Sequence, residues 1–446
     1  MEIAEIKSII DAGDHNKVKV AFCDIDGILR GKLMSTDKFL SAVQDDFGFC
    51  DIVFGWDSSD EDYDKVKVTG WHTGYPDGKA TIDHNSLRNI PWEDDVPMFL
   101  ADFRNDNKRA HVCPRTLLNS ITEKANAIGY TPKFSQEFEW FNFAESPQTV
   151  NEKGFRNLEG LTPGMFGYSL LRASLESEYV HDLFDSLEEF GIPLEGLHTE
   201  TGPGVYEAAI TYSGIQEAAD RAVLFKTSVK ELAYQHSIMA TFMAKFDMNL
   251  PGCSGHVHQS LWKGDVNAFH GDDNGMSDVM RHYVAGQLHC LPEILPMMAP
   301  TVNSYKRLVK GAWAPTTATW GIDNRTVALR ALPGGDKSCR LETRVPGADC
   351  NPFLAMSACL AAGLYGIENK LEPRDPTQGS GYDDKDAVGL ANNLQKATGI
   401  MRDSTIAKEL FGADFVDHFC TTREWEWRQF SNEVTDWERK RYFEII

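Results

Sequence analysis

In several segments, charged and apolar residues alternate with the two-residue period of a β-strand. This alternation limits the possible folds of the chain more than any other sequence feature. In TPKFSQEFEWFNF (131–143), Phe134 and Trp140 fall on one face of a strand. Glu137 and Glu139 fall on the other face. Two carboxylates on one face repel each other unless water or a cation lies between them. The segment therefore predicts either a solvated outer strand or a strand that lines a cation-binding interior.

Two later segments add candidate metal ligands. In LHTETGPGVYEAAI, Glu200 precedes a Gly-Pro-Gly turn and Glu207 lies on the strand that follows. In GCSGHVHQSLW, His256 and His258 share one strand face. Hard divalent cations prefer carboxylate oxygens and accept an occasional imidazole. An ordinary turn with solvated glutamates and a pair of structural histidines would explain each segment taken alone.

Arginines gather in the same half of the chain. In CRLETRV, two arginines flank Glu342 on one strand face, which could equally be a surface row of ion pairs. Arginine suits the two-point recognition of carboxylates and phosphates. The five arginines concerned are Arg307, Arg325, Arg330, Arg340 and Arg344.

The length of 446 residues predicts more than one domain. Isoleucines at helical spacing predict a helix over 2–12, and the following alternation, with its Asp26-Gly27 hairpin turn, predicts a small, mostly β domain over 1–107. Residues 108–446 form the second expected domain, in which helical and strand patterns are mixed. We expect helices near 115–128, 215–235, 275–290, 352–369 and 404–446. We expect strands near 64–70, 79–83, 96–103, 132–143, 204–211, 237–246, 255–262, 325–332 and 339–345.

Composition excludes several classes of protein. The chain has 44 basic and 66 acidic residues, a net charge of −22, which argues against a nucleic acid partner. Neither G-x-x-x-x-G-K-[ST] nor G-x-G-x-x-G occurs, so metals and arginines would have to hold any nucleotide phosphates. The longest apolar stretch, 353–367, is shorter than the ~20 residues of a membrane span and predicts a buried helix. Nine cysteines without a C-x-x-C pair predict free thiols and a cytoplasmic protein.

Six ordered motifs together resemble the glutamine synthetase superfamily: E-F-E, E-x-G-P-G-x-Y-E, G-H-V-H-Q-S, N-S-Y-K-R-L, D-N-R-x-x-x-x-R and R-L-E-x-R-x-P. The resemblance covers most of residues 110–370. It implies an α+β fold, in which an N-terminal β-grasp domain precedes a catalytic domain with a curved antiparallel sheet flanked by helices. It also implies a homo-oligomer of stacked rings, a dodecamer or decamer.

The resemblance further implies a role for each matching residue. Two or three Mg²⁺ or Mn²⁺ ions would bind per site, one to Glu139, Glu200 and Glu207 and another to Glu137, His256 and Glu342. The glutamate substrate would contact Gly252, Arg307 and Arg344. ATP would contact His258, Ser260, Arg325, Arg330 and Arg340. The catalytic arginines would be Arg307, Arg325 and Arg344.

The implied reaction has two steps. ATP phosphorylates the γ-carboxylate of L-glutamate, and an amine then attacks the γ-glutamyl phosphate. A carboxylate is a poor electrophile, and phosphorylation supplies a leaving group. Metals and arginines would neutralise the charge that phosphoryl transfer spreads over oxygens.

Two departures from the family pattern concern the amine. The ammonia-using flap G-Y-E-A-P reads Gly-Ala-Trp-Ala-Pro here, so that Trp313 replaces the acid. The motif D-G-S-S appears as Trp56-Asp57-Ser58-Ser59, where Asp57 could be a displaced equivalent of the aspartate. Ammonium needs anionic partners, whereas an indole offers an apolar face. We therefore expect a primary organic amine as substrate, as in the polyamine, alkylamide and anilide branches, with Trp313, Trp56 and Asp57 near it.

Two other functions stay open at this point. One is an ammonia-using glutamine synthetase with an altered flap, and the other is a non-catalytic structural member of the family. The presence of every expected metal ligand and arginine argues against the structural role.

A third departure from the family pattern, Gly252-Cys253-Ser254-Gly255-His256 in place of G-S-G-M-H, predicts a differently shaped glutamate loop. In a ring assembly, Trp56 and Asp57 would reach across a subunit boundary.

Overall fold

The alternating pattern of the first hundred residues folds as a six-stranded sheet. The computed structural model describes residues 1–13 and 15–446. The strand order is β2-β1-β6-β4-β3, with β5 paired to β6, and β1 runs parallel to β6 but antiparallel to β2. The strands are β1 (Lys17–Cys23), β2 (Leu29–Ser35), β3 (Phe47–Cys50), β4 (Asp77–Ile82), β5 (Arg88–Ile90) and β6 (Val96–Asp102).

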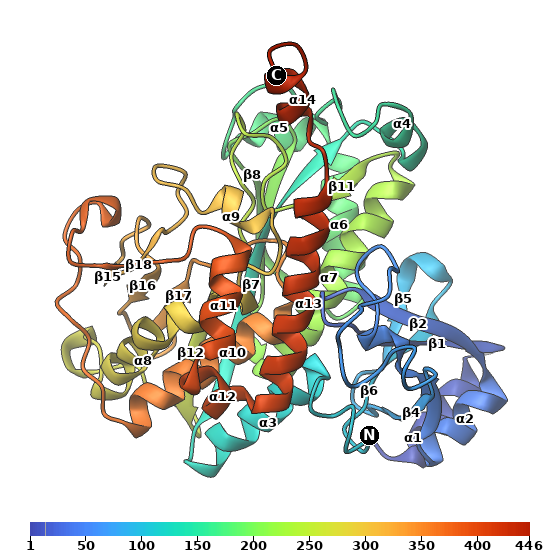
Figure 1. Ribbon diagram of the computed structural model, residues 1–446. Coiled ribbons are helices and arrows are strands. Elements are labelled where there is room, and N and C mark those ends of the chain that lie inside the picture. Colours follow the sequence, from blue (N-terminus) through green and yellow to red (C-terminus); the bar gives the residue numbers. More distant parts are fainter. Residues whose placement is uncertain (14) are drawn as a thin grey trace.

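The two faces of this sheet are buried in two different hydrophobic cores. Val18, Val20 and Phe22 of β1 are buried in one core with helices α1 (Ile3–Ala12) and α2 (Thr36–Gln44). Ala21 and Cys23, on the opposite face, belong to the core formed by the rest of the chain. Figure 1 shows this sheet in blue at the lower right, beside the red helix α13 (Ala413–Asn432). Because α1, α2 and one face of this sheet form a core of their own, we propose that residues 1–107 and 108–446 are separate domains.

The second sheet has ten strands and is the centre of the molecule. Its order is β15-β16-β17-β12-β7-β9-β8, with β10 and β11 paired to β7 and β13 paired to β12, and all pairs except β15–β16 are antiparallel. The strands are β7 (Thr131–Phe143), β8 (Leu194–Thr199), β9 (Val205–Ile210), β10 (Ser213–Gly214), β11 (Met239–Thr241), β12 (Val257–Lys263), β13 (Val266–Asn267), β15 (Trp320–Ile322), β16 (Leu329–Leu332) and β17 (Arg340–Thr343). The expected α+β class with a curled, largely antiparallel sheet flanked by helices is confirmed.

Helices cover the apolar face of this sheet. Phe138 and Trp140 of β7 each lie 5.7 Å, between ring centroids, from Phe225 of helix α7 (Ile215–Gln235). The apolar stretch expected to form a buried helix is α10 (Pro352–Glu368), which packs against α3 (Pro114–Ala127), α7 and α8 (Asp278–Ile294). The side chain of Asn351 accepts a hydrogen bond from the Phe353 amide and caps α10. In the described part of the chain, no helix combines the length and apolarity that crossing a bilayer requires.

Shorter elements complete the fold. Helices α4 (Pro147–Glu152), α5 (Leu170–Leu175) and α6 (Ser177–Glu189) lie between β7 and β8, and α9 (Ser304–Arg307) follows α8. Strands β14 (Thr317–Ala318) and β18 (Val388–Gly389) form a separate pair. The C-terminal helices are α11 (Leu394–Asp403), α12 (Thr405–Phe411), α13 and α14 (Asp436–Tyr442). Helices α14 and α5 are both found at the top of Figure 1.

Three expected strands differ from the structure, and of the one expected over 325–332 only β16, Leu329–Leu332, forms. No strand forms within 64–70, because Val66 packs into the core as part of an irregular segment that ends in a turn at Gly70, while Thr69 donates a hydrogen bond to Asp51. The strand expected over 237–246 is limited to β11, Met239–Thr241. Alternating burial can thus arise without a partner strand.

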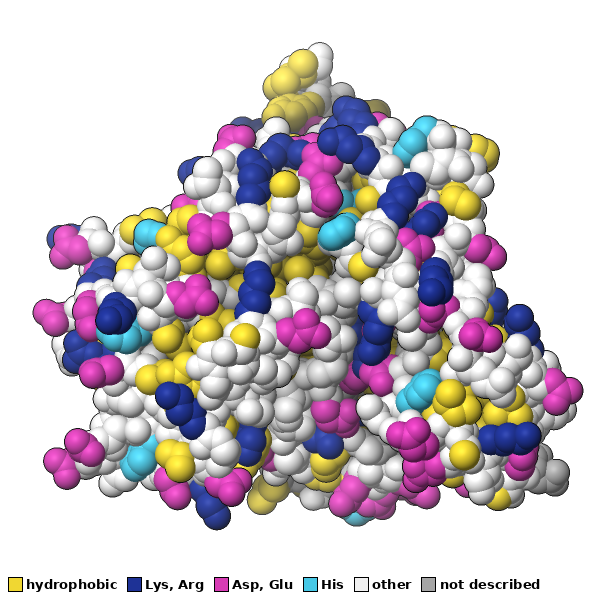
Figure 2. All heavy atoms as spheres, turned by 90° about the horizontal axis from the view of Figure 1, so that it is seen from below, with side chains coloured by type: hydrophobic (Ala, Val, Ile, Leu, Met, Phe, Trp, Pro, Cys, Tyr) yellow, Lys and Arg dark blue, Asp and Glu magenta, His cyan; other side chains and the backbone are white. Residues whose placement is uncertain are grey.

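The surface carries charges of both signs. Figure 2 shows acidic and basic side chains interspersed over the face seen from below, with apolar side chains between them. The excess of acidic residues is therefore spread out on this face.

Candidate active site

Strands from distant parts of the chain open onto one polar cavity of about 380 Å³. It lies against the curled sheet, on the side where β7, β9 and β17 present their carboxylates. All six expected metal ligands line this cavity: Glu137, Glu139, Glu200, Glu207, His256 and Glu342. Gly252, Arg307, Trp313, Arg325, Arg330 and Arg344 line it as well. Twelve of the residues singled out from the sequence therefore meet in one place.

Strand register explains this convergence. Glu139 of β7 lies directly opposite Glu207 of β9, and His258 of β12 lies opposite Glu342 of β17. Because side chains alternate along a strand, Glu137 shares the face of Glu139. The opposite face of β7 is occupied by buried aromatic rings, so a shift by one residue would bury the carboxylates instead.

One group of ligand atoms is formed by His198, Glu200 and Glu207, whose nearest oxygens and nitrogens lie within 4.8 Å of one another. The Nε2 atom of His198 is 3.5 Å from Oε1 of Glu207, and its Nδ1 atom is 3.6 Å from Oε1 of Glu200. Burial and the neighbouring Glu137 and Glu139 carboxylates raise the pKa of Glu207 to about 8. A cation would offset this repulsion.

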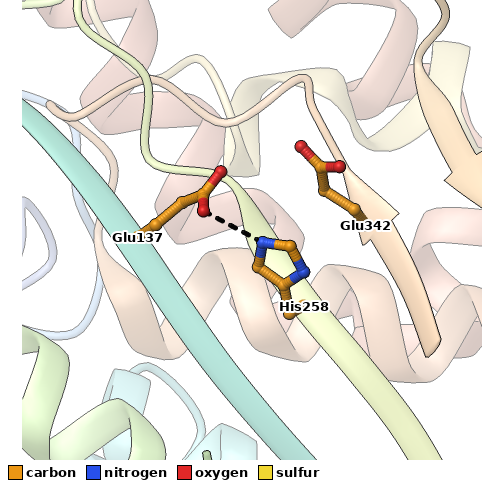
Figure 3. A group of neighbouring side chains, drawn as sticks. All are labelled: Glu137, His258 and Glu342. Atoms are coloured by element: carbon orange, nitrogen blue, oxygen red, sulfur yellow. Dashed lines mark ion pairs between the residues drawn. The ribbon is translucent and has the colours of Figure 1, made fainter. Parts of the chain in front are cut away.

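The second group consists of Glu137, His258 and Glu342, shown in Figure 3. His256 lies next to Glu137 and Glu342. His256 Nδ1 lies 2.7 Å from Oε1 of Glu137 and 3.4 Å from Oε1 of Glu342. His258 Nε2 lies 3.2 Å from Oε2 of Glu137. Burial alone would raise the pKa of Glu137, but the imidazoles of His258 and His256 outweigh burial and hold this pKa well below its ordinary value.

The donor set fits hard divalent cations. Carboxylate oxygens with one or two imidazoles are the ligands that Mg²⁺ and Mn²⁺ accept. The Nε2 atom of His256 is buried and has no hydrogen-bond partner among the described residues. An uncompensated buried nitrogen beside clustered carboxylates is consistent with a bound ion.

Arg307 and Arg344 are anchored on one side of the cavity. Arg307 is buried, and its guanidinium donates to the backbone oxygens of Val345 (2.9 Å) and Arg344 (3.1 Å). Arg344 donates to Glu342 through Nη1. A side chain at Gly252 would place its Cβ 2.8 Å from Cγ of Arg307, so only glycine leaves this arginine in position.

Arg325 and Arg330 also line this cavity. Arg330 donates to Oε2 of Glu342 (2.9 Å) and to Oδ1 of Asp323 (3.0 Å from Nε). It thus joins the second ligand group to a neighbouring loop and keeps a cationic group at the cavity wall. Asp323 was not expected at the site.

The three other residues expected to contact ATP lie in an adjacent cavity of about 260 Å³, which also includes Glu137. Arg340 Nε lies 3.3 Å from Nδ1 of His258, and the hydroxyl of Ser260 accepts a hydrogen bond of 2.9 Å from Trp262. The ammonium of Lys133 lies 3.9 Å from the ring centroid of Trp262. Glu137 therefore connects the two cavities.

Two exposed aromatic side chains flank the first cavity. Trp313 is 68% exposed and Tyr168 is 70% exposed, and both have left-handed backbones, with φ of 56° and 55°. The Tyr168 ring stacks on His198 with 4.3 Å between ring centroids. The segment that follows Trp313 is held by a hydrogen bond of 3.1 Å, which the hydroxyl of Tyr382 donates to the carbonyl of Ala314.

Trp56 and Asp57 do not line either cavity of their own chain. The Trp56 ring lies under the guanidinium of Arg30, 5.2 Å from its centroid. Oδ1 of Asp57 accepts from the amides of Ser59 and Glu61, and Oδ2 accepts from Trp425. Within one chain, Asp57 therefore stabilises its own loop.

Sequence reasoning missed Tyr168 and Ser254 as cavity residues, and His198 as a member of the first ligand group. His198 could have been found, because it precedes Glu200 by two residues and thus shares its strand face. Tyr168 lies in a loop without periodicity, so no sequence pattern places it. Ser254 was noted only as a departure in the glutamate loop.

Comparisons with known proteins agree with this geometry. The family "Glutamine synthetase, catalytic domain" matches residues 111–442. The chain is 53% identical over 438 residues to "Type-1 glutamine synthetase 2" of Dictyostelium discoideum, covering 96% of this chain and 84% of that protein. It is 36% identical over 452 residues to "Glutamate--isopropylamine ligase" of Pseudomonas sp, covering 100% and 98%. The solved structure "GmaS/ADP complex-Conformation 1" superposes with a TM-score of 0.85 at 27% identity, covering 98% of this chain and 99% of that chain.

Proposed function

The chain belongs to the glutamine synthetase family, and from this premise we propose that it joins the γ-carboxylate of L-glutamate to a primary organic amine with the use of ATP. The family match and the relatives over the whole chain support an ATP-dependent ligase. The choice of an organic amine over ammonia is the finer part of the proposal. Trp313 is the observation that carries it.

Trp313 exposes an indole to the cavity at the flap position where ammonia-using members have a glutamate. A carboxylate there would desolvate ammonium and draw off its proton, whereas an indole supplies an apolar wall and one N–H donor. Tyr168 adds a second exposed ring to the same cavity. The alkyl or aryl part of an organic amine would pack against these rings, and the relative named as an isopropylamine ligase supports this substrate class.

The proposed reaction balances in two transfers. A γ-carboxylate oxygen of glutamate attacks the terminal phosphorus of ATP, and ADP leaves. The amine nitrogen then attacks the acyl carbon, loses a proton, and displaces inorganic phosphate. Arg307 and Arg344 would hold the carboxylates of glutamate, while Arg325 and Arg330 would stabilise the charge on the phosphoryl oxygens.

Two metal positions are part of the proposal. Glu139, Glu200 and Glu207 would hold one Mg²⁺ or Mn²⁺ ion. Glu137, His256 and Glu342 would hold another, with His258 close enough to share this role. Such ions neutralise phosphate charge and polarise phosphoryl oxygens when bound. The nucleotide itself would occupy the adjacent cavity next to His258, Ser260 and Arg340.

One observation favours a second candidate, an ammonia-using glutamine synthetase. The relative at 53% identity is named "Type-1 glutamine synthetase 2". In this alternative, Trp313 would pack the flap and the Glu200–Glu207 pair would attract ammonium. A non-catalytic role is disfavoured, because the ligand groups and arginines are retained together in one cavity.

We also propose a homo-oligomer of stacked rings. Trp56 and Asp57 lie away from the cavities of their own chain, which is compatible with a role at a neighbouring subunit's site. Light scattering of the purified protein tests the assembly, and a monomer would contradict it.

The function is tested by phosphate release from ATP in the presence of Mg²⁺, glutamate and a panel of amines: ammonia, methylamine, isopropylamine, ethanolamine, aniline and putrescine. We expect at least one organic amine to exceed ammonia in kcat/KM by about tenfold or more, a difference near 1.4 kcal/mol. Ammonia exceeding every organic amine would instead establish the second candidate.

A further inference from the structure

Ser254 lines the cavity and carries a buried hydroxyl that none of the roles above uses. Its side chain is 3% exposed, and Oγ has no hydrogen-bond partner in the part of the chain that the structure describes. Ser254 is also among the residues that line the cavity, between Gly252 and His256. A buried hydroxyl without a partner destabilises the free protein, so its retention indicates a ligand that supplies one.

The backbone of Ser254 is fixed on both sides. Its amide donates to Oε2 of Glu139 at 2.7 Å, its carbonyl accepts from the Glu139 amide at 3.0 Å, and it forms a β-bridge with Gly347. The only freedom left is rotation of the hydroxyl about χ1. The backbone of Ser254 is therefore preorganised next to the Glu139 carboxylate, and a turn about χ1 directs Oγ toward a ligand that lies against this carboxylate.

The residue type itself is a departure. Residues 252–256 read G-C-S-G-H, where the family motif is G-S-G-M-H, so Ser254 stands at a glycine position. The hydroxyl is thus an addition of this chain, and the serine of the motif is replaced by the buried Cys253.

We propose that Ser254 Oγ binds the amino acid substrate by accepting a hydrogen bond from its α-ammonium group. This inference rests on the proposed function, because it takes glutamate as the substrate. The cationic α-ammonium is attracted to the Glu139 carboxylate, whereas Arg307 and Arg344 favour the carboxylates of the substrate. Since the Ser254 amide already donates to Glu139, a group that approaches this carboxylate also approaches the Ser254 side chain, whose Oγ meets it after a turn about χ1.

The first measurement compares glutamate with glutarate, which lacks only the α-amino group. In Ser254→Ala, we expect the glutamate KM to rise about tenfold, with unchanged KM for ATP and for the amine. The inhibition constant of glutarate against glutamate should change less than twofold. Ser254→Gly, which restores the residue type of the motif, should give the same result.

A matched control is available in α10. Ser357 is also buried and its hydroxyl also lacks a partner within the described residues, but it lines neither cavity. Ser357→Ala should leave the glutamate KM unchanged. Thermal melting of both alanine variants identifies any loss of folding.

Three results would overturn the proposal. They are an unchanged glutamate KM in both Ser254 variants, equal losses for glutamate and glutarate, or a rise confined to the apparent Mg²⁺ requirement, which would assign Oγ to a metal. Failure of the proposed function gives a different result in the wild-type protein. Either ammonia exceeds every organic amine, in which case glutamate is still the substrate and the Ser254 test still applies, or no amine supports turnover.

Discussion

The indole Nε1 of Trp425, in helix α13, donates a hydrogen bond of 2.9 Å to Oδ2 of Asp57, 368 residues earlier in the chain. The Trp425 ring also makes an edge contact with Tyr63, at 6.1 Å between centroids. Arg428 pairs with Asp64 at 2.5 Å one turn farther along the helix. Helix α13 therefore fixes the loop that carries Trp56 and Asp57.

Trp425→Phe should loosen this loop while it keeps the ring packing. One carboxylate oxygen of Asp57 loses its donor, which costs about 1 kcal/mol of unfolding free energy. We expect faster hydrogen exchange at the amides of Ser59 and Glu61, which donate to the same carboxylate. Trp427→Phe is the control, because Trp427 packs in the same helix without contacting Asp57 through its indole nitrogen. Equal exchange rates in both variants would argue against a role of the Trp425–Asp57 hydrogen bond in fixing the loop.

A buried histidine in the same helix predicts acid sensitivity. Burial lowers the pKa of His418 to about 4, and neither ring nitrogen has a partner among the residues described. In the unfolded chain its pKa is near 6.5, so the unfolded state binds more protons between about pH 6.5 and 4. Stability is therefore complete above pH 6.5 and is lost as pH falls toward 4, by at most roughly 3 kcal/mol.

His418→Leu should remove this part of the pH dependence. The variant should lose less thermal stability than the wild-type protein between pH 7.5 and pH 5.0. Replacement of the exposed His111 by Leu should leave the wild-type pH dependence in place. If the melting temperatures of wild type and His418→Leu fell by the same amount over this pH range, the contribution of His418 to acid sensitivity would be excluded.

The strand faces could be predicted from the sequence because their period is set by backbone geometry. Glu137 and Glu139 were placed together on one face of β7, and the structure places Glu207 opposite Glu139. Such a pattern needs only local information. The order of the motifs then supplied the family, which the match over residues 111–442 confirms.

Contacts between distant irregular segments could not be predicted in this way. The Trp425–Asp57 bond joins a helix to a turn, and neither element has a pattern that names its partner. The same holds for Tyr168, whose stacking on His198 depends on the path of a loop. The expected strand over 64–70 failed for a related reason, since alternation reports burial and not pairing.

A buried ion network predicts how firmly the N-terminal sheet is attached. Arg115 of α3 pairs with Asp83 (2.5 Å), Asp102 (2.9 Å) and Asp220 (2.8 Å), of which the first two belong to the N-terminal segment. Arg115→Met would leave the buried carboxylate of Asp220 without its cation, which typically costs about 3–5 kcal/mol, whereas Asp102 still pairs with Arg104. We expect a separate, earlier unfolding transition in urea. Adding Asp220→Asn should recover part of the loss, and additive losses in the double variant would contradict the network.

The flap predicts the choice of amine. Trp313→Glu restores a carboxylate at the cavity, so kcat/KM for ammonia should rise about tenfold and kcat/KM for organic amines should fall. Trp313→Ala separates charge from packing, because it should weaken organic amines without helping ammonia. Kinetics with both amine classes measure the ratio. An unchanged ratio in Trp313→Glu would remove Trp313 from the determinants of specificity.

The carboxylate pair at Glu139 and Glu207 predicts that metal binding depends on pH. Burial and the neighbouring carboxylates raise the pKa of Glu207 to about 8, whereas a metal requires the ionised form, so binding should release a proton. The affinity for Mn²⁺ should therefore rise by up to about tenfold per pH unit as pH increases toward 8, and level off above it. Isothermal titration in buffers of different ionisation enthalpy measures both the affinity for Mn²⁺ and the number of protons released.

Glu207→Gln should weaken Mn²⁺ binding and abolish the proton release, whereas Glu188→Gln, on the exposed face of α6, should do neither. Because Mn²⁺ binds only the folded protein, it should also raise the melting temperature of the wild type more than that of Glu207→Gln. Equal proton release in wild type and Glu207→Gln would show that another group carries this proton.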